Sequence, residues 1–148
     1  MSMRRRFAWL PLILLAAVPL QADLARVLAE SNLEKRSQLA LDNAVAAYKS
    51  ARTAYEKGEL EEVAAAAKEI QESIELAYTS LTKTGKDPRK SPKWFKKAEI
   101  ATRDLLRRLE SFQQEMGFSD RPLFDPVKNR VAQVHDELLV GLMEGKRK

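Results

Sequence analysis

The sequence contains no cysteine and only one histidine, and these absences exclude several kinds of site. Without cysteine the chain cannot form disulfides or thiolate metal sites. The histidine, His135, has Ala132 three residues before it, so the paired Glu-x-x-His ligands of a di-iron bundle are missing. No serine or acidic pair shows the local signature of a nucleophile or of a general acid and base. We therefore expect a protein that is not an enzyme and that holds no metal or cofactor.

The N-terminal segment 1–22 differs from the rest of the chain. Three consecutive arginines at 4–6 precede a 14-residue apolar run over 7–20, and Ala22 stands before the charged Asp23. The run is shorter than the roughly 20 residues that span a bilayer. The pattern predicts a signal peptide over 1–22, cleaved after Ala22, and export to the periplasm or the medium. An uncleaved anchor is the alternative, and the general secretory and twin-arginine routes both stay open.

The charge of the chain is nearly balanced once the predicted signal peptide is removed. The 26 basic and 21 acidic residues give a formal charge of +5, but three arginines lie within 1–22 and leave +2 on the remainder. This balance gives no reason to expect specific nucleic-acid binding. Outside the signal peptide the longest apolar runs are 63–67 and 138–143, so no transmembrane helix is expected after cleavage.

Glycine and proline are scarce, and they separate segments in which apolar residues recur three and four positions apart. This spacing predicts helices at about 31–57, 59–84, 92–116 and 126–144. Short links between them predict an all-α fold, a four-helix antiparallel bundle formed by one domain over 23–145. Segment 23–30 is either a short separate helix or an extension of the first long one. Residues 146–148 are predicted to be a solvated basic tail.

Caps and apolar stripes give each helix a predicted start and a predicted buried face. Residues 31–34 (SNLE) indicate a capping box with Ser31 as the cap. Ser91 and Asp125 each precede a proline, which is typical of a cap followed by the first helical position. The clearest stripe, in the second helix, begins at Leu60, and the stripe of the third helix begins at Trp94.

The turn between the first two helices has a familiar sequence. Segment 54–63 (AYEKGELEEV) resembles the turn of a tetratricopeptide-type helical hairpin in its Ala54-Tyr55 pair, Gly58 and its acidic residues. Val63 occupies a position where that family usually has alanine, and the chain has no second copy of the segment. Because such repeats need about three units to bury a core, the resemblance implies only a local hairpin, with a possible tendency to bind protein.

The link between the second and third helices is the candidate binding segment. Residues 83–97 contain seven basic residues and a single acidic one, Asp87. Cations beside aromatic rings suit an anionic surface or an acidic patch on a protein. The competing interpretation is a solvated loop in which Trp94 belongs to the core. The candidate partner-binding residues are Lys86, Arg89, Lys90, Lys93, Trp94, Phe95, Lys96 and Lys97.

These patterns favour an exported, non-enzymatic interaction or structural module at the cell envelope. The alternative is a periplasmic helical-bundle carrier or sensor for a small ligand, in which Tyr48, Tyr55 and Tyr78 line a site between the helices. The identity of the partner and the oligomeric state do not follow from the sequence.

Overall fold

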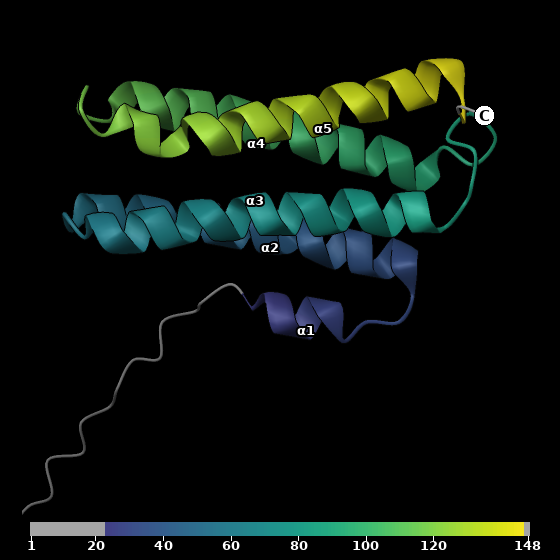
Figure 1. Cartoon of the computed structure of the whole chain (residues 1–148), viewed down its shortest axis with the longest axis horizontal. Coiled ribbons are helices and arrows are strands. Elements are labelled where there is room, and N and C mark those ends of the chain that lie inside the picture. Colours follow the sequence, from purple (N-terminus) through teal and green to yellow (C-terminus); the bar gives the residue numbers. More distant parts are fainter. Residues whose placement is uncertain (1–22, 147–148) are drawn as a thin grey trace, which may run out of the picture.

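The computed structural model describes residues 23–146, which form helices and no strand (Figure 1). The elements are α1 (Leu24–Leu28), α2 (Leu33–Glu56), α3 (Leu60–Lys83), α4 (Lys93–Glu115), the 3₁₀ helix η1 (Arg121–Phe124) and α5 (Asp125–Glu144). The prediction of an all-helical chain with four long helices is confirmed. The predicted signal peptide over 1–22 and the last two residues of the basic tail lie outside the described residues. Within residues 23–146, no helix is long and apolar enough to cross a membrane.

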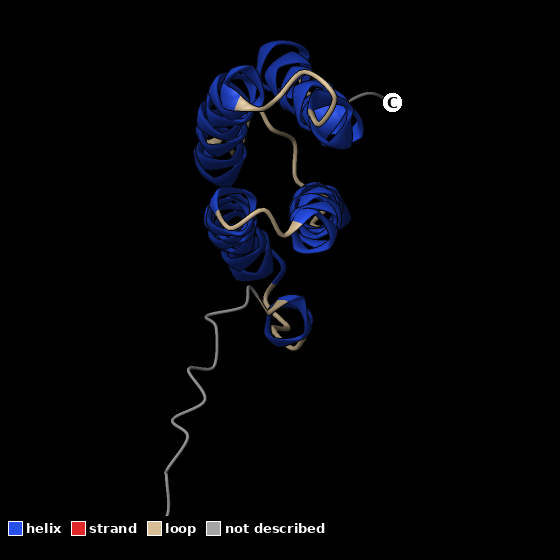
Figure 2. Ribbon diagram, turned by 90° about the vertical axis from the view of Figure 1, so that its left-hand side faces the viewer, coloured by secondary structure: helices blue, strands red, loops and turns tan. Residues whose placement is uncertain are grey.

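The four long helices are arranged as two hairpins, α2 with α3 and α4 with α5, one layered on the other (Figure 1). Viewed along the helices, the four long elements surround a shared interior, and α1 lies outside it (Figure 2). The short N-terminal segment is therefore a separate helix, not an extension of α2. It packs on α2 through the buried side chain of Val27.

The α2–α3 hairpin is held together by small residues. Every fourth or third position of α2 carries a buried alanine: Ala40, Ala44, Ala47, Ala51 and Ala54. Such short side chains let the two helices approach closely. Two hydrogen bonds between the helices satisfy buried polar groups, because the Ser37 hydroxyl donates to the Ala77 carbonyl at 2.8 Å and the Asn43 amide donates to the Ser73 hydroxyl at 2.9 Å.

The turn that joins α2 to α3 is a Schellman motif. Gly58 has φ of +73°, a left-handed conformation that glycine adopts without a Cβ penalty. The Glu59 amide donates to the Ala54 carbonyl at 3.0 Å and the Gly58 amide donates to the Tyr55 carbonyl, also at 3.0 Å. These bonds close the C-terminus of α2 and reverse the chain at once.

Three of the predicted caps are wrong. The N-cap of α2 is Asn32, whose side chain accepts from the Lys35 amide at 2.9 Å, and not Ser31. The Ser91 amide donates to the Asp87 carbonyl within the preceding turn, and α4 begins at Lys93 with Pro92, and not Ser91, at the N-cap and no side-chain cap. Asp125 is the first residue of α5 because η1 runs directly into that helix.

Two of the predicted stripes begin at the wrong residue. Leu60 remains 43% exposed in the first turn of α3, and the buried face starts at Val63. In α4 the core position belongs to Phe95, which is 5% exposed, whereas Trp94 is only half-buried against the core. The remaining large core side chains form one continuous cluster across both hairpins.

Candidate functional site

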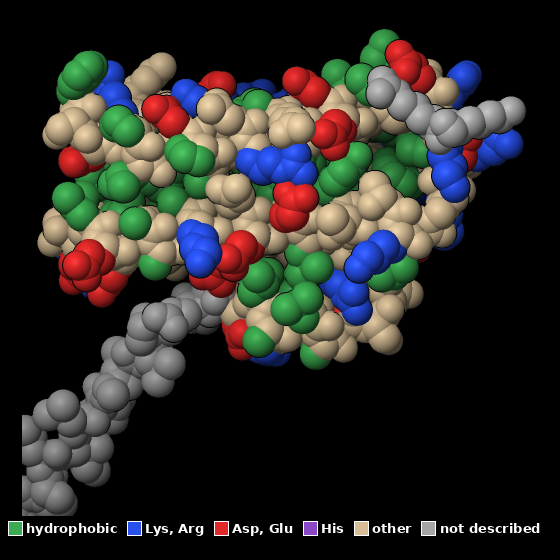
Figure 3. Space-filling view, viewed as in Figure 1, with side chains coloured by type: hydrophobic (Ala, Val, Ile, Leu, Met, Phe, Trp, Pro, Cys, Tyr) green, Lys and Arg blue, Asp and Glu red, His purple; other side chains and the backbone are tan. Residues whose placement is uncertain are grey.

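The basic segment 83–97 lies at the end of the molecule where α5 ends (Figure 1). It comprises the last residue of α3, the link, and the first turn of α4. The link is tightly folded. Gly85 has φ of +70°, the Asp87 carboxylate accepts from the Arg89 amide at 2.9 Å, and the Asp87 carbonyl accepts from the Lys90 amide. In Figure 3, blue side chains gather toward this end of the face that α3 and α5 present.

Trp94 and Phe95, adjacent in sequence, have different environments. The Phe95 ring is in the core and is not free to reach a macromolecular partner. The Trp94 ring contacts two cations, with the Lys93 and Lys97 amines 5.1 and 4.6 Å from the ring centroid. Contacts of this kind hold the long lysine side chains against the ring. Of the two aromatic candidates, only Trp94 therefore contributes to the surface.

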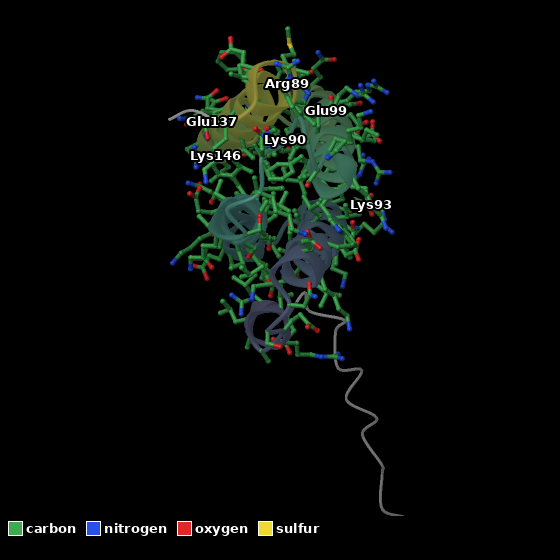
Figure 4. The ribbon with its side chains drawn as sticks, turned by 90° about the vertical axis from the view of Figure 1, so that its right-hand side faces the viewer. Arg89, Lys90, Lys93, Glu99, Glu137 and Lys146 are labelled. Atoms are coloured by element: carbon green, nitrogen blue, oxygen red, sulfur yellow. The ribbon has the colours of Figure 1, made fainter. Side chains whose placement is uncertain are left out.

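Most cations of the segment form no ion pair with a carboxylate of residues 23–146. Among the seven basic residues of 83–97, only Lys86 forms an ion pair with another described residue, through its amine and the Glu34 carboxylate. The structure adds Lys146, whose amine donates to the Gly85 carbonyl at 3.2 Å. Viewed onto this end (Figure 4), Lys93 lies on one side of the molecule and Lys146 on the other, with Lys90 between them. The cations therefore surround the end of the bundle and do not form one flat patch.

A groove of about 800 Å³ opens between α3, α5 and the link. Phe95 and Leu138 contribute its apolar part, and one helical face of α5 lines its length. In Figure 3 green side chains line the recess between the two hairpins on the side where the chain ends. The link approaches α5 so closely that a Cβ on Gly141 would lie 3.2 Å from the Pro88 ring.

The three tyrosines of the carrier hypothesis do not share a site. Tyr78 lines the groove. Tyr48 and Tyr55 instead pack edge-on against Phe112, with ring centroids 6.1 and 5.7 Å apart, and Phe112 packs in the same way against Phe124. Their hydroxyls are already hydrogen-bonded, so these two rings belong to the core packing between the hairpins.

Charged groups in and near the groove are linked across the hairpins. Arg130 of α5 makes a bidentate ion pair with Glu75 of α3 at 2.6 and 2.8 Å, and its guanidinium is 3.9 Å from the Glu137 carboxylate. Burial raises the pKa of the Tyr78 hydroxyl, and its hydrogen bond to Glu137 raises that pKa further. The Tyr78 phenol is therefore held in its neutral form.

His135 is on α5 and contacts α4. Its Nε2 is 3.0 Å from the Glu99 carboxylate, which also pairs with Arg103, and its Nδ1 is 3.5 Å from Asp136. Across residues 23–146, no group of three or more His, Cys, Asp or Glu side chains is placed to hold a metal ion. The contacts of His135 are those of a residue that joins two helices.

The groove, Lys146 and Glu34 were missed by sequence reasoning. Lys146 is near the C-terminus and Glu34 is on α2, so nothing local connects either of them with the link. Comparison with known proteins adds no assignment: no protein-family model matches the sequence, and no curated protein is significantly similar to it. A functional argument must therefore rest on the residues and their geometry.

Proposed function

We propose that the protein is exported, folds as an antiparallel four-helix bundle and acts at the cell envelope as a non-enzymatic interaction module. Its partner is a protein with an acidic surface. One observation carries the proposal: the seven cations of the basic segment 83–97, six of them without an ion-pair partner among the described residues, share one end of the bundle with Lys146. Export rests on the signal-peptide pattern of residues 1–22.

The arrangement of the cations favours a concave acidic partner over a flat anionic membrane. Lys93 and Lys146 lie on opposite sides of the end (Figure 4), so a plane that touches one of them does not readily reach the other. A partner that encloses the end could meet both. Complementary charge would orient the approach and raise the rate of association, and the exposed part of Trp94 would add apolar contact.

Charge reversal tests the proposal. The variant in which Lys90, Lys93 and Lys97 are changed to glutamate is compared with wild type in a cross-linked pull-down of the tagged mature protein from the envelope fraction. The expected result is a partner captured by wild type and lost in the variant, while far-UV circular dichroism is unchanged because these side chains are exposed.

A matched control separates the site from bulk charge. Reversing Lys49, Lys68 and Arg107, which are also exposed but lie on the long helices away from the link, changes the net charge equally. This variant should keep the partner. Loss of the partner in both variants, or retention in both, would contradict a specific role for the link. Binding of wild type to anionic vesicles as tight as to the captured protein would identify a lipid surface in place of a protein.

The groove supports a second candidate function, that of a carrier or sensor for a small ligand. Its volume of about 800 Å³ lies within the range of small-molecule sites. Native mass spectrometry of the protein purified from its own compartment separates the two candidates. A bound molecule of defined mass favours the carrier, whereas a ligand-free protein that captures a polypeptide favours the interaction module.

A further inference from the structure

The charged groups that line the groove are negative in one part of its length and positive in another. Asp136 and Glu137, midway along α5, contribute carboxylates, and Lys86 and Lys146 contribute amines where the helix ends. Between them the lining is mainly apolar and includes Leu138, Val140, Gly141, Pro88 and Phe95. Figure 4 shows Glu137 and Lys146 on the same side of the molecule. A complementary ligand would carry a positive group, an apolar middle and a negative group in that order.

The separation of the two charged regions suggests how long such a ligand is. From Glu137 to the end of α5 at Glu144 the helix advances seven residues, or about 10 Å at 1.5 Å per residue, and the non-helical Gly145 and Lys146 follow. An extended peptide advances about 3.3 Å per residue, so roughly four residues cover this helical length and the residues after it. We propose that the groove binds a short zwitterionic peptide of about this length, with its ammonium group at Asp136 and Glu137 and its carboxylate at Lys86 and Lys146.

Three of the four charged side chains retain capacity for these contacts, whereas Glu137 is already engaged by Tyr78, Arg130 and Gln133 and contributes chiefly its negative charge. The Asp136 side chain is 77% exposed, and its carboxylate lies 3.5 Å from Nδ1 of the His135 ring. The Lys146 amine donates one hydrogen bond to the Gly85 carbonyl, and its two other hydrogens remain for a ligand carboxylate. The Lys86 amine already pairs with the Glu34 carboxylate, so it should bind a ligand carboxylate more weakly than the Lys146 amine does. The ligand's apolar side chains would cover the half-buried apolar groups of the groove wall, which are Pro88, Ala132 and Val140.

A simple acyl chain fits this lining less well than a peptide. Its carboxylate could reach the lysines, but its hydrocarbon tail would lie against Asp136, Glu137, Asn129 and Gln133. Covering such groups without replacing their hydrogen bonds to water is unfavourable. A peptide offers backbone amides and a terminal ammonium at those positions. This inference rests on the carrier function proposed above and specifies the class of ligand.

Titration with defined peptides tests the ligand class. The probe is the tetrapeptide Ala-Leu-Leu-Ala with free termini, added to the mature protein and followed by isothermal calorimetry and by amide shifts in NMR. N-acetylation and C-amidation should each weaken binding by about three- to fivefold, because each removes one partly solvated charge pair. Dodecanoate provides the comparison with an acyl chain. Dodecanoate binding more tightly than the peptide, with N-acetylation having no effect, would overturn the ligand class and leave the carrier function standing.

A groove-filling variant tests the location. Ala132→Leu places a larger side chain on the wall without removing a polar group, whereas Ala65→Leu makes the same change at an exposed position of α3 outside the groove. Binding should fall at least about tenfold, or 1.4 kcal/mol, in the first variant and persist in the second. Equal binding in both variants would overturn the groove as the site. No binding of either the peptide or dodecanoate to wild type would overturn the peptide proposal and remove the support for the carrier, while leaving the interaction module to its own test.

Discussion

Replacing Ile74 with alanine tests whether the two hairpins share a tightly packed core. Ile74 lies on α3 at 0% exposure. The substitution removes three buried carbon atoms, which at about 0.8 kcal/mol each contributes roughly 2.4 kcal/mol. A residual cavity of about 50 Å³ would add roughly 1.2 kcal/mol at about 24 cal/mol per Å³. We therefore expect the free energy of unfolding to fall by about 3.5 kcal/mol.

Urea unfolding followed by far-UV circular dichroism measures this change. With a slope of about 2 kcal/mol per molar urea, the midpoint should decrease by roughly 1.7 M. Leu60→Ala is the matched control, because Leu60 lies on the same helix and remains 43% exposed. It should cost less than about 1 kcal/mol.

The comparison of the two variants can refute the packing argument. If Ile74→Ala lowers stability no more than Leu60→Ala does, the side chain is not enclosed as the structure places it. The shared core between the hairpins, on which the position of the groove depends, would then be wrong.

Two further predictions concern tyrosine hydroxyls. The Tyr55 hydroxyl accepts from the Gly117 amide at 2.8 Å and donates to the Asp120 carboxylate at 3.0 Å. These two bonds connect α2 with the segment between α4 and η1. Tyr55→Phe should lower stability by about 1 kcal/mol in urea unfolding and increase amide exchange at Gly117, and unchanged exchange would show that the bond is not formed in solution. The second prediction follows from the raised pKa of Tyr78, which burial causes first and the Glu137 hydrogen bond second. A raised folded-state pKa gives stability that is complete below the ordinary tyrosine pKa of about 10 and lost as pH rises through the raised value. The stability of wild type relative to Tyr78→Phe should therefore decline as pH rises above about 10, and a constant difference would contradict the burial of this hydroxyl.

The helical periodicity was sufficient to predict which residues form helices, but it did not place their first turns. The spacing of apolar residues over several turns is redundant, so one misplaced residue such as Leu60 leaves the prediction of α3 intact. A cap depends instead on one side chain and one amide. Ser31 and Asn32 are both good caps, and only the backbone geometry selects Asn32. The same limit applies to Trp94 and Phe95, since a shift of one residue changes which ring is buried.

The groove was not predictable because it depends on contacts distant in sequence. The face of α5 that lines it includes Asn129, Gln133 and Asp136, which a helical pattern assigns to solvent. The face becomes a wall only when Tyr78 on α3 and the link approach it from the other side. The basic link, in contrast, could be recognised because its charges are consecutive in sequence.

A near-neutral net charge does not argue against an anionic partner, because the charges are separated along the molecule. The turn between α2 and α3, at the end opposite the link, carries the acidic residues Glu56, Glu59, Glu61 and Glu62. The 24 residues of α3 span about 36 Å, whereas the Debye length is about 8 Å at physiological ionic strength. A partner at the basic end is therefore screened from the acidic end and responds to the local excess of cations. Near that end the attraction should still weaken as salt is added, so the salt dependence of association measures the cations of the basic end and not the net charge of the protein.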